Sequence, residues 1–273
     1  MGDIDHLAIV RLGLDDAREG LALSSEAHWN QNEADWRFFL TAGTVFAVRN
    51  GDGRLIATAA LLPYTFANAW ISMVLVTQNW RRRGLATKLL DACLNAAAKR
   101  GLTTWLDATP AGATVYGPLG FVPTLELRRL RFAGSPTAAA PQLAFDGGLD
   151  ELIARDRRAM GFDRSVLLGE LGRRPGSRLV SNGGAVALVR DGRTARQIGP
   201  LFADDIASAT ALVETIVQSD PILIDVVGEH HEFLENLTGA GWTMERPFRR
   251  MRFGRATIEN ARPPFAVAGP EYG

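Results

Sequence analysis

Cysteine and net charge are what this sequence has least of. Its 273 residues include one cysteine, Cys93, which excludes a disulfide within the chain and a cysteine-based zinc site. Lysine and arginine together number 30, and so do aspartate and glutamate. This balance gives no electrostatic reason to expect nucleic acid or a membrane surface as a partner. Four scattered histidines give no indication of a metal site.

Long apolar runs are also missing. No stretch reaches the roughly 18 apolar residues that a membrane-spanning helix needs, and residues 1–6 are acidic rather than apolar. With the lone cysteine, these absences predict a soluble cytoplasmic protein. Apolar residues nevertheless make up 47% of the chain, which is enough for a packed core, and the length is nearer two domains than one.

Hydrophobic periodicity predicts strands and helices in both halves. The expected strands are residues 6–12, 44–49, 55–62, 70–76, 103–107, 121–132, 185–190, 196–198, 222–227 and 242–253. The expected helices are residues 15–27, a short one after Asn32, 83–100, a short one before Gly117, 148–172, 204–218 and one ending at Leu237. Residues 50–53, Asn-Gly-Asp-Gly, predict a hairpin.

A proline-containing stretch of small residues, 133–141, has the composition of a linker. It predicts domains at residues 1–134 and 142–256, joined by a linker at 135–141 and followed by a proline-rich tail at 257–273.

The two halves repeat one pattern in the same order. The matches are Leu106-Asp107 with Ile224-Asp225, Gly120-Phe121 with Gly241-Trp242, Arg128-Arg129-Leu130-Arg131-Phe132 with Arg249-Arg250-Met251-Arg252-Phe253, and residues 76–80 with 198–202. Several matches in order indicate two copies of one fold.

The copies differ where a strand gives way to a helix. The first copy has Arg81-Arg82-Arg83-Gly84-Leu85-Ala86-Thr87, and free helix amides, a glycine and guanidinium groups together favour binding of a pyrophosphate. A solvated basic helix start is the simpler alternative, but a basic first turn opposes the helix dipole unless an anion compensates it. The second copy has Asp204 and Asp205 there, so we expect a helix that is capped internally and repels polyanions.

These residues make the first half resemble the GNAT superfamily of N-acetyltransferases. The run from Arg81 to Ala86 is similar to the family's Arg/Gln-x-x-Gly-x-Gly/Ala signature, and the run from Tyr116 to Phe121 is similar to its Tyr-x-x-Leu-Gly-Phe element. The resemblance covers residues 5–134, and the whole chain resembles a bacterial subgroup with a second, degenerate acetyltransferase-like domain. It implies an α/β (α+β) fold with two GNAT-like domains, each a mixed, mostly antiparallel sheet flanked by helices.

The resemblance implies acetyl-CoA as cosubstrate and no metal. The positions that would hold its pyrophosphate are Arg81, Arg82, Arg83, Gly84, Leu85, Ala86 and Thr87, and those whose strand edge would pair with its pantetheine arm are Met73, Val74, Leu75 and Val76. The family often has an Asn after the strand that ends near Asp107, and this sequence has none there.

Tyr116 would donate a proton to the departing CoA thiolate, as the family implies. A phenol with a pKa of about 10 suits a thiol with a pKa of about 8.5. The alternative is a core tyrosine beside Phe121, but Leu237 takes the equivalent position in the second copy, where no chemistry is expected.

The sequence does not single out the base that removes the proton of the amine. Glu26, His28, Asp225 and Glu229 are candidates, and each also has an ordinary interpretation as a surface or helix-capping residue. Three aromatic residues are candidates for the wall of an acceptor pocket or, alternatively, for the core, and these are Trp29, Trp36 and Tyr64. Cys93 is expected to face the sheet and to be inert.

The favoured hypothesis is an N-acetyltransferase that moves an acetyl group directly from acetyl-CoA to a primary amine of a small or amino-acid-like acceptor. The second domain is expected to shape the acceptor pocket, and the protein to be a monomer or homodimer. The alternatives are an acetyltransferase acting on a peptide or protein amine and a non-enzymatic acyl-CoA sensor, which would not need Tyr116.

Overall fold

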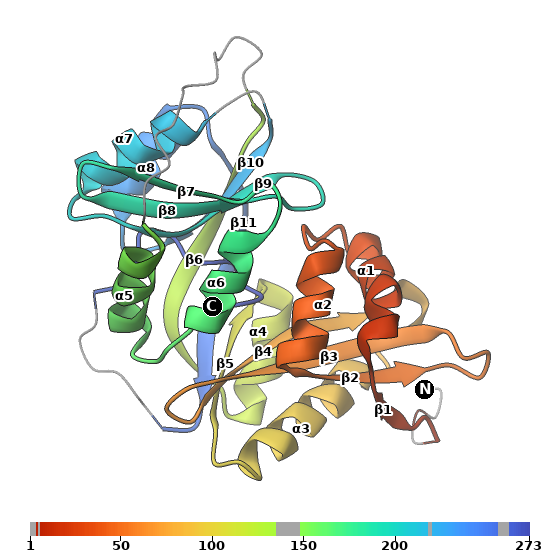
Figure 1. The fold of residues 1–273 in the computed structure, drawn as a ribbon. Helices are drawn as coiled ribbons and strands as arrows, with labels where there is room; N and C mark the ends of the chain where they lie inside the picture. Colours follow the sequence, from red (N-terminus) through yellow and green to blue (C-terminus); the bar gives the residue numbers. More distant parts are fainter. Residues whose placement is uncertain (1–3, 5, 135–147, 218–219, 256–261) are drawn as a thin grey trace. The chain divides into compact units, whose positions relative to one another are not determined.

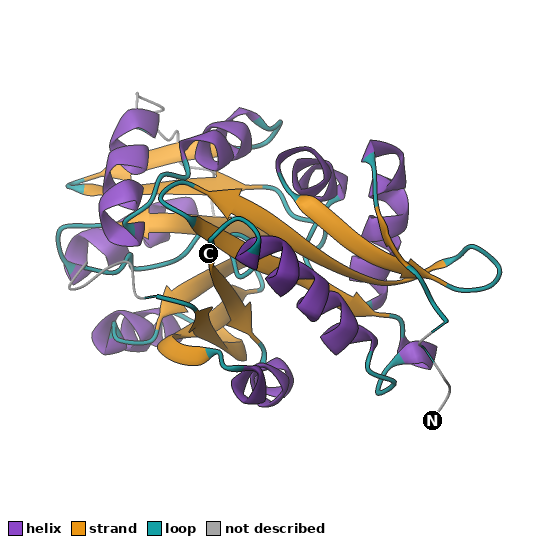
Figure 2. Cartoon of the chain, turned by 90° about the horizontal axis from the view of Figure 1, so that it is seen from below, coloured by secondary structure: helices purple, strands orange, loops and turns teal. Residues whose placement is uncertain are grey.

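The chain divides into two compact units in a computed structural model that describes residues 4, 6–134, 148–217, 220–255 and 262–273. One unit is Met1–Leu106 with Arg252–Gly254, and the other is Asp107–Met251 with Arg255–Gly273. In each unit the strands lie between helices (Figure 2). The expected linker at 135–141 lies outside the described residues.

The first unit has a mostly antiparallel sheet with α1 and α2 on one face and α3 on the other (Figure 1). Its strands, in spatial order, are β1 (Ile9–Arg11), β2 (Thr44–Arg49), β3 (Leu55–Tyr64), β4 (Asn68–Val76) and β5 (Thr103–Ala108). Its helices are α1 (Ala17–Glu26), α2 (Glu33–Ala42) and α3 (Leu85–Ala98), with short turns η1 (Leu14–Asp16) and η2 (Gln78–Trp80). Only β4 and β5 pair in parallel among the pairs described for this unit.

Local sequence explains these elements. Asn32 caps α2 by accepting a bond from the amide of Asp35, whose carboxylate in turn accepts from the amide of Asn32. On α3 the residues Leu85, Leu89 and Cys93 form a buried apolar stripe, and burial raises the pKa of the Cys93 thiol, as expected for an inert cysteine. The predicted hairpin is confirmed, with Gly53 at a φ of 78° between β2 and β3.

A bulge distorts β4 next to the β3 pairing. Thr58 pairs with Leu75 and Ala60 pairs with Ser72, so β4 has one more residue than β3 over this stretch. Met73 takes a φ of 51°, and its carbonyl accepts a bond from the hydroxyl of Thr58 at 2.8 Å. In the described part of the chain, β5 pairs with β4 only over residues 68–70, so the two strands separate just before the bulge.

The second unit has helices on both faces of its sheet (Figure 1). Its strands, in spatial order, are β11 (Thr243–Phe253), β6 (Val122–Phe132), β10 (Ile222–Val227), β9 (Arg196–Phe202), β8 (Ala185–Arg190) and β7 (Arg178–Asn182). Its helices are α4 (Pro110–Tyr116), α5 (Leu149–Met160), α6 (Ser165–Arg173), α7 (Ile206–Ile216) and α8 (His231–Gly239), with the short turn η3 (Gly117–Leu119).

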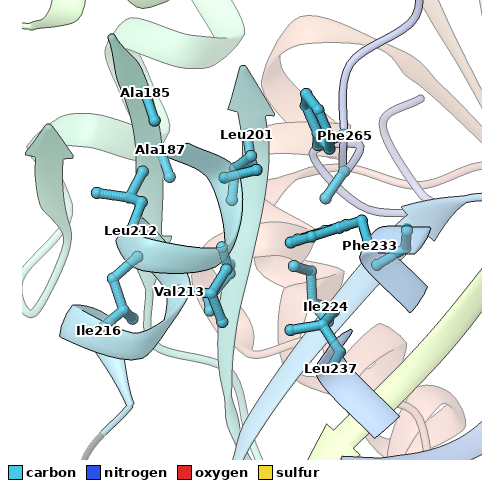
Figure 3. Packing of buried hydrophobic residues seen from close by; sticks show 14 of the residues in the cluster. Ala185, Ala187, Leu201, Leu212, Val213, Ile216, Ile224, Phe233, Leu237 and Phe265 are labelled. Carbon is cyan, nitrogen blue, oxygen red and sulfur yellow. The ribbon is translucent and has the colours of Figure 1, made fainter. Parts of the chain in front are cut away.

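The helical segment expected at 148–172 is confirmed and consists of two helices, because Gly161 ends α5 with a φ of 69°. Two details differ from the expected strands. Strand β7 was not expected, and β9 runs on to Phe202 rather than ending at 198. The core of this unit fills the space between the sheet and helices α7 and α8 (Figure 3).

The repeated motif of the sequence forms two equivalent buried ion pairs. Strand β6 of the first copy pairs with β10 of the second, and Arg129 binds Asp225 through two bonds of 2.8 Å. Arg250 of the second copy binds Asp107 of the first through two bonds of 2.9 Å. Each copy therefore supplies the aspartate for the other copy's arginine.

Residues 262–273 pack into the second unit. Phe265, Ala266, Val267 and Tyr272 are each at most 2% exposed, and Ala266 bridges β9 and β10. Arg190 and Glu271 form another buried ion pair at 2.8 Å. The described part of the segment predicted as a proline-rich tail is thus integrated into the core.

Candidate active site

The loop between β4 and α3 carries the predicted pyrophosphate residues. Arg81 and Arg83 are tied back to the loop through the carbonyls of Val76 and Asn79, each at 3.0 Å. The Arg83 guanidinium also lies 4.8 Å from the centre of the Trp80 ring. Arg82 adopts a φ of 58°, and all three arginines are exposed. The loop therefore presents a cationic surface on a defined backbone.

Helix α3 begins without a side-chain cap. Gly84 takes the N-cap position with a φ of 92°, a conformation that other residues rarely adopt. The first amides of a helix have no partner within it, so those of Leu85, Ala86 and Thr87 can bind an anion. This is the arrangement expected for a helix that binds phosphate.

The equivalent helix of the second unit is closed by its own side chain. Asp205 caps α7 by accepting a bond from the amide of Ser208 at 2.7 Å, which confirms the expected internal cap. The connection is also shorter: residues 203–205 join β9 to α7, whereas residues 77–84 join β4 to α3. Only the first unit has the long arginine-bearing loop among the described connections of this type.

The edge of β4 beyond the bulge fits an amide-bearing ligand. Residues 73–76 have β3 on one side and no β5 partner on the other in the described part of the chain. Ser72, beside the bulge, has a buried hydroxyl without a partner among the described residues. A strand edge with unpaired backbone groups and an orphaned hydroxyl suits the two amides of a pantetheine arm.

Glu26 and His28 lie at the C-terminal end of α1. The Glu26 carboxylate accepts a hydrogen bond of 2.7 Å from the amide of Gln78, which lies in the loop between β4 and α3. His28 is exposed and ends the helix with a φ of 57°. The structure thus gives Glu26 a positioning contact and leaves the His28 ring at the surface.

The predicted acceptor aromatics lie in different environments. Trp36 is completely buried, and its indole donates to the hydroxyl of Ser24 at 3.0 Å. A methyl group at Gly20 would lie 2.3 Å from the Trp36 ring, so α1 and α2 pack closely there. Trp29 and Tyr64 are half-buried. Trp36 is therefore a core residue and does not line an acceptor pocket.

Tyr116 ends α4 in the second unit. The helix begins at Thr109, whose hydroxyl accepts a bond from the amide of Gly112 at 3.2 Å. The Tyr116 ring is half-buried and lies 6.0 Å from the Phe121 ring. A methyl group at Gly112 would lie 3.0 Å from the Tyr116 ring, so the glycine leaves room for that ring.

Asp225 is enclosed rather than available to a substrate. It is fully buried, both of its oxygens accept from Arg129, and Gln197 donates to it at 2.8 Å. Although burial opposes the charge of Arg129, Asp225 outweighs this effect and raises the pKa of Arg129. Glu229 is exposed in the turn before α8. We therefore assign Asp225 a structural role.

A cavity of about 530 Å³ lies in the second unit. Ala113 and Thr114, on the helix that carries Tyr116, contribute to its wall. The other lining residues are Ala108, Pro110, Glu126, Arg128, Met244, Pro247, Phe248 and Arg249. Sequence reasoning missed this cavity, although Arg128 and Arg249 are equivalent positions of the repeat, which is a signal that could have indicated a shared site.

The charges at the cavity are arranged around one carboxylate. Glu126 accepts from Arg128 at 2.6 Å and from Arg249 at 3.4 Å, and Arg128 lowers the pKa of Glu126. Two guanidinium groups around one carboxylate leave the cavity with an excess of positive charge.

Among the described residues, no three His, Cys, Asp or Glu side chains are grouped so that they could hold a metal ion. No described helix is both long and apolar enough to cross a membrane.

Together, the fold and the loop define a GNAT-type acyltransferase in tandem form. A model described as the acetyltransferase (GNAT) family matches residues 14–121, and one described as an acetyltransferase (GNAT) domain matches residues 152–263. The two matches cover well over half of the chain, which therefore belongs to the GNAT acetyltransferases. Members of this family generally use acetyl-CoA.

Relatives agree with this assignment. "Uncharacterized N-acetyltransferase YitH" of Bacillus subtilis (strain 168) is 23% identical over 81% of this chain and 83% of its own length. A candidate acetyltransferase from Pyrococcus horikoshii shares the fold with a TM-score of 0.79 at 20% identity, covering 98% of this chain and 96% of its own. A tandem GNAT protein from the clavulanic acid biosynthesis pathway has a TM-score of 0.64 at 16% identity, covering 92% and 100%.

Proposed function

We propose that this protein transfers the acetyl group of acetyl-CoA to the primary amine of a small, amino-acid-like acceptor. The observation that carries the proposal is the contrast between two helix starts. Helix α3 is opened by Gly84 behind three exposed arginines, whereas α7 is capped by its own Asp205. The first unit is thus suited to a polyanionic cosubstrate and the second is not.

The residues of the first unit supply two kinds of contact to acetyl-CoA. Amides from Arg82 to Thr87 hold the pyrophosphate, with charge from Arg81, Arg82 and Arg83. The free edge of β4, at Met73, Val74, Leu75 and Val76, pairs with the amides of the pantetheine arm. Acetyl-CoA supplies an activated thioester, and the protein supplies orientation and proton transfer.

Two side chains are proposed to move protons. Tyr116 donates a proton to the thiolate that leaves as the amine attacks, which restores a neutral thiol. His28 accepts the proton that the amine loses, because its imidazole is exposed whereas the Glu26 carboxylate already binds the Gln78 amide.

The cavity beside α4 supports a small-molecule acceptor. Its volume of about 530 Å³ falls within the range of pockets that enclose small ligands. Met244, Pro247 and Phe248 provide an apolar wall, and Arg128 and Arg249 provide charge for a carboxylate. An amino acid with an apolar side chain combines the amine, the carboxylate and the apolar body that this lining suits.

The decisive test is an assay of thiol release with acetyl-CoA and a panel of amines. The panel contains apolar amino acids, their amides as matched compounds without the carboxylate, simple alkyl amines and short peptides. We expect turnover with the amino acids and a KM at least about tenfold higher for the amides, because a charge-assisted bond is lost. Turnover with peptides alone would overturn the small-molecule proposal.

Cosubstrate binding is tested separately by charge reversal. The double variant Arg82→Glu, Arg83→Glu should weaken acetyl-CoA binding by about a hundredfold, since two charge-assisted contacts become repulsive. Arg157→Glu, Arg158→Glu on α5 is the matched control, because these two arginines are also adjacent and exposed. Equal affinities in calorimetry for both variants would contradict the assignment of the loop.

A further inference from the structure

Each unit contains a pair of parallel strands that separate after a short ladder. Strands β4 and β5 pair over residues 68–70 and 103–105, and strands β9 and β10 pair over residues 196–198 and 222–224. The first strand of each pair has a matching bulge, at residues 72–75 of β4 and at residues 198–201 of β9. The two openings are therefore equivalent positions in the two copies of the fold.

In the second unit this opening is filled by residues 264–268 of the same chain. On the β9 side, the Leu201 amide donates to Ala266 at 2.9 Å, and the Phe265 amide donates to Leu201 at 2.9 Å. On the β10 side, the Val227 amide donates to Phe265 at 3.0 Å, and the Val267 amide donates to Asp225 at 3.0 Å. An extended segment thus binds both strand edges through its main chain.

Side chains hold the same segment in place. The Phe265 ring stacks on His230 at 4.2 Å and meets the Phe233 ring edge-on at 5.3 Å (Figure 3 shows Phe265 beside Leu201 and Phe233). His230 also bonds through its Nε2 to the carbonyl of Pro264 at 3.0 Å. Small residues, Ala266 and Ala268, follow the aromatic ring and are completely buried.

The strand edge is shaped to let this chain approach. At Gly199, in the bulge of β9, a methyl group would lie 2.0 Å from the carbonyl oxygen of Val267. The φ of Gly199 is 148°, a conformation reserved almost entirely for glycine. Met73 occupies the corresponding bulge of β4 in the first unit. The close approach of a peptide backbone is therefore a property of the second opening.

We infer that the opening between β9 and β10 is a peptide-binding cleft that takes an extended segment with one aromatic residue followed by small ones, and that residues 264–268 occupy it in cis. The mode is strand addition, in which main-chain bonds give affinity and one pocket gives specificity. A corollary, which rests on the proposed function, is that only the β4 edge of the first unit accepts pantetheine, so the protein binds one acetyl-CoA per chain.

The test is peptide exchange in the folded full-length protein. A protease recognition sequence is placed at residues 256–261, the protein is cleaved after folding, and a fluorescent peptide of residues 262–273 is added. Two matched peptides serve as competitors, one with Phe265→Ala and one with the same residues in scrambled order. Amide exchange at Leu201 and Val227 reports occupancy of the cleft directly.

We expect the cleaved segment to stay bound or to be replaced by the fluorescent peptide, with Leu201 and Val227 protected in either case. The Phe265→Ala peptide should compete at least about tenfold more weakly, since a buried aromatic anchor is lost. Release of the segment without binding of the fluorescent peptide would overturn the inference, and so would equal competition by the scrambled peptide.

The corollary is measured in calorimetry on the uncleaved protein. One acetyl-CoA per chain is expected, and two would overturn the corollary by showing that the second opening also takes the cosubstrate. Binding of none would instead remove the proposed function. The peptide arm uses no acetyl-CoA, so the two failures are distinguishable.

Discussion

Tyr116 shows how much a single residue depends on the backbone that presents it. Its ring packs over Gly112 on the preceding turn of α4, where a methyl group would come within 3.0 Å of the ring. We expect Tyr116→Phe to lower kcat about a hundredfold while the KM for acetyl-CoA changes less than about twofold, because only proton donation is lost. Steady-state thiol release measures both constants.

Gly112→Ala should displace the same ring and lower kcat less than Tyr116→Phe does. Its control is Gly117→Ala at the end of α4, where an added methyl group meets nothing within 4 Å. An unchanged kcat in Tyr116→Phe would remove this residue from the acid role.

Only Ala27 separates Glu26 from His28, yet their different contacts predict different tasks for them. Glu26 binds the Gln78 amide, so Glu26→Ala should raise the KM for acetyl-CoA several-fold and leave kcat nearly unchanged. His28→Asn should instead lower kcat about tenfold or more and leave the KM for acetyl-CoA nearly unchanged, because the group that accepts the amine proton is lost. Steady-state thiol release measures both constants for both variants. An unchanged kcat in His28→Asn together with a lowered kcat in Glu26→Ala would reverse the assignment.

The residues next to a position in the sequence predict its backbone structure better than they predict its burial. The sequence predicts that α3 begins without a side-chain cap at Gly84 and that Asp205 caps α7, because capping depends on residues only a few positions away. The burial of Trp36 and Asp225 depends instead on segments far along the chain, including Ser24 for the first and Arg129 for the second. The sequence near an aromatic or acidic residue therefore could not show whether that residue belongs to the candidate site or to the core.

At the scale of elements, the bulges of β4 and β9 correct the alignment of the repeat. The sequence matched residues 198–202 with 76–80, but the strand registers match them with residues 72–76. The difference arises because the loop after β9 is shorter than the loop after β4. The hydrophobic pattern of the sequence does not show where residues are missing from such a loop. The sequence largely predicts which segments are helices and which are strands. The register of the strands depends on how they pair in the fold, which the sequence pattern does not show.

Gly199 connects the bulge of β9 to the segment of residues 264–268. Gly199→Ala should lower the free energy of unfolding by about 2 kcal/mol or more, because it adds backbone strain and a collision with Val267. It should also speed amide exchange at Leu201 and Val227 before global unfolding. Urea titration and exchange monitored by NMR measure the two effects.

Gly183→Ala is the control for this prediction. Gly183 also has a positive φ, of 52°, but an added methyl group there meets nothing within 4 Å. Its cost should stay near 1 kcal/mol, as expected for one residue in the left-handed region. Equal losses in both variants would show that strain alone, rather than contact with Val267, accounts for the effect.

At the scale of the whole molecule, the two copies are joined by exchanged partners. Strand β6 of the first copy pairs with β10 of the second, and Arg252–Gly254 of the second copy belongs to the first compact unit. The repeat in the sequence predicts two similar folds. It cannot show whether a strand pairs within its own copy or with the other copy, because the equivalent strands of the two copies are equally compatible with each sheet. The two Asp–Arg pairs give the physical link between the copies.

Removal of either aspartate should therefore have the same effect. Asp225→Ala and Asp107→Ala each leave a buried arginine without its counterion, and each should cost about 3–5 kcal/mol of stability. Glu33→Ala, which breaks an exposed ion pair with Arg37, should cost less than about 1 kcal/mol. Urea unfolding measures all three. A small loss in only one of the aspartate variants would show that the two pairs are not equivalent.

The difference between the two helix starts also predicts which amides exchange more slowly when acetyl-CoA binds. At a concentration 100 times its Kd, a ligand stabilises the state that binds it by about 2.7 kcal/mol, which slows amide exchange about a hundredfold at sites that open only when the ligand is released. We expect this slowing at residues 84–90 and along the β4 edge. Residues 201–208 of the second unit should be unaffected, because Asp205 caps α7 and residues 264–268 line its strand edge. Hydrogen exchange with mass spectrometry resolves these segments, and the Arg82→Glu, Arg83→Glu variant serves as the control without binding. Equal protection of both helix starts would mean that the two copies share the cosubstrate chemistry despite their different sequences.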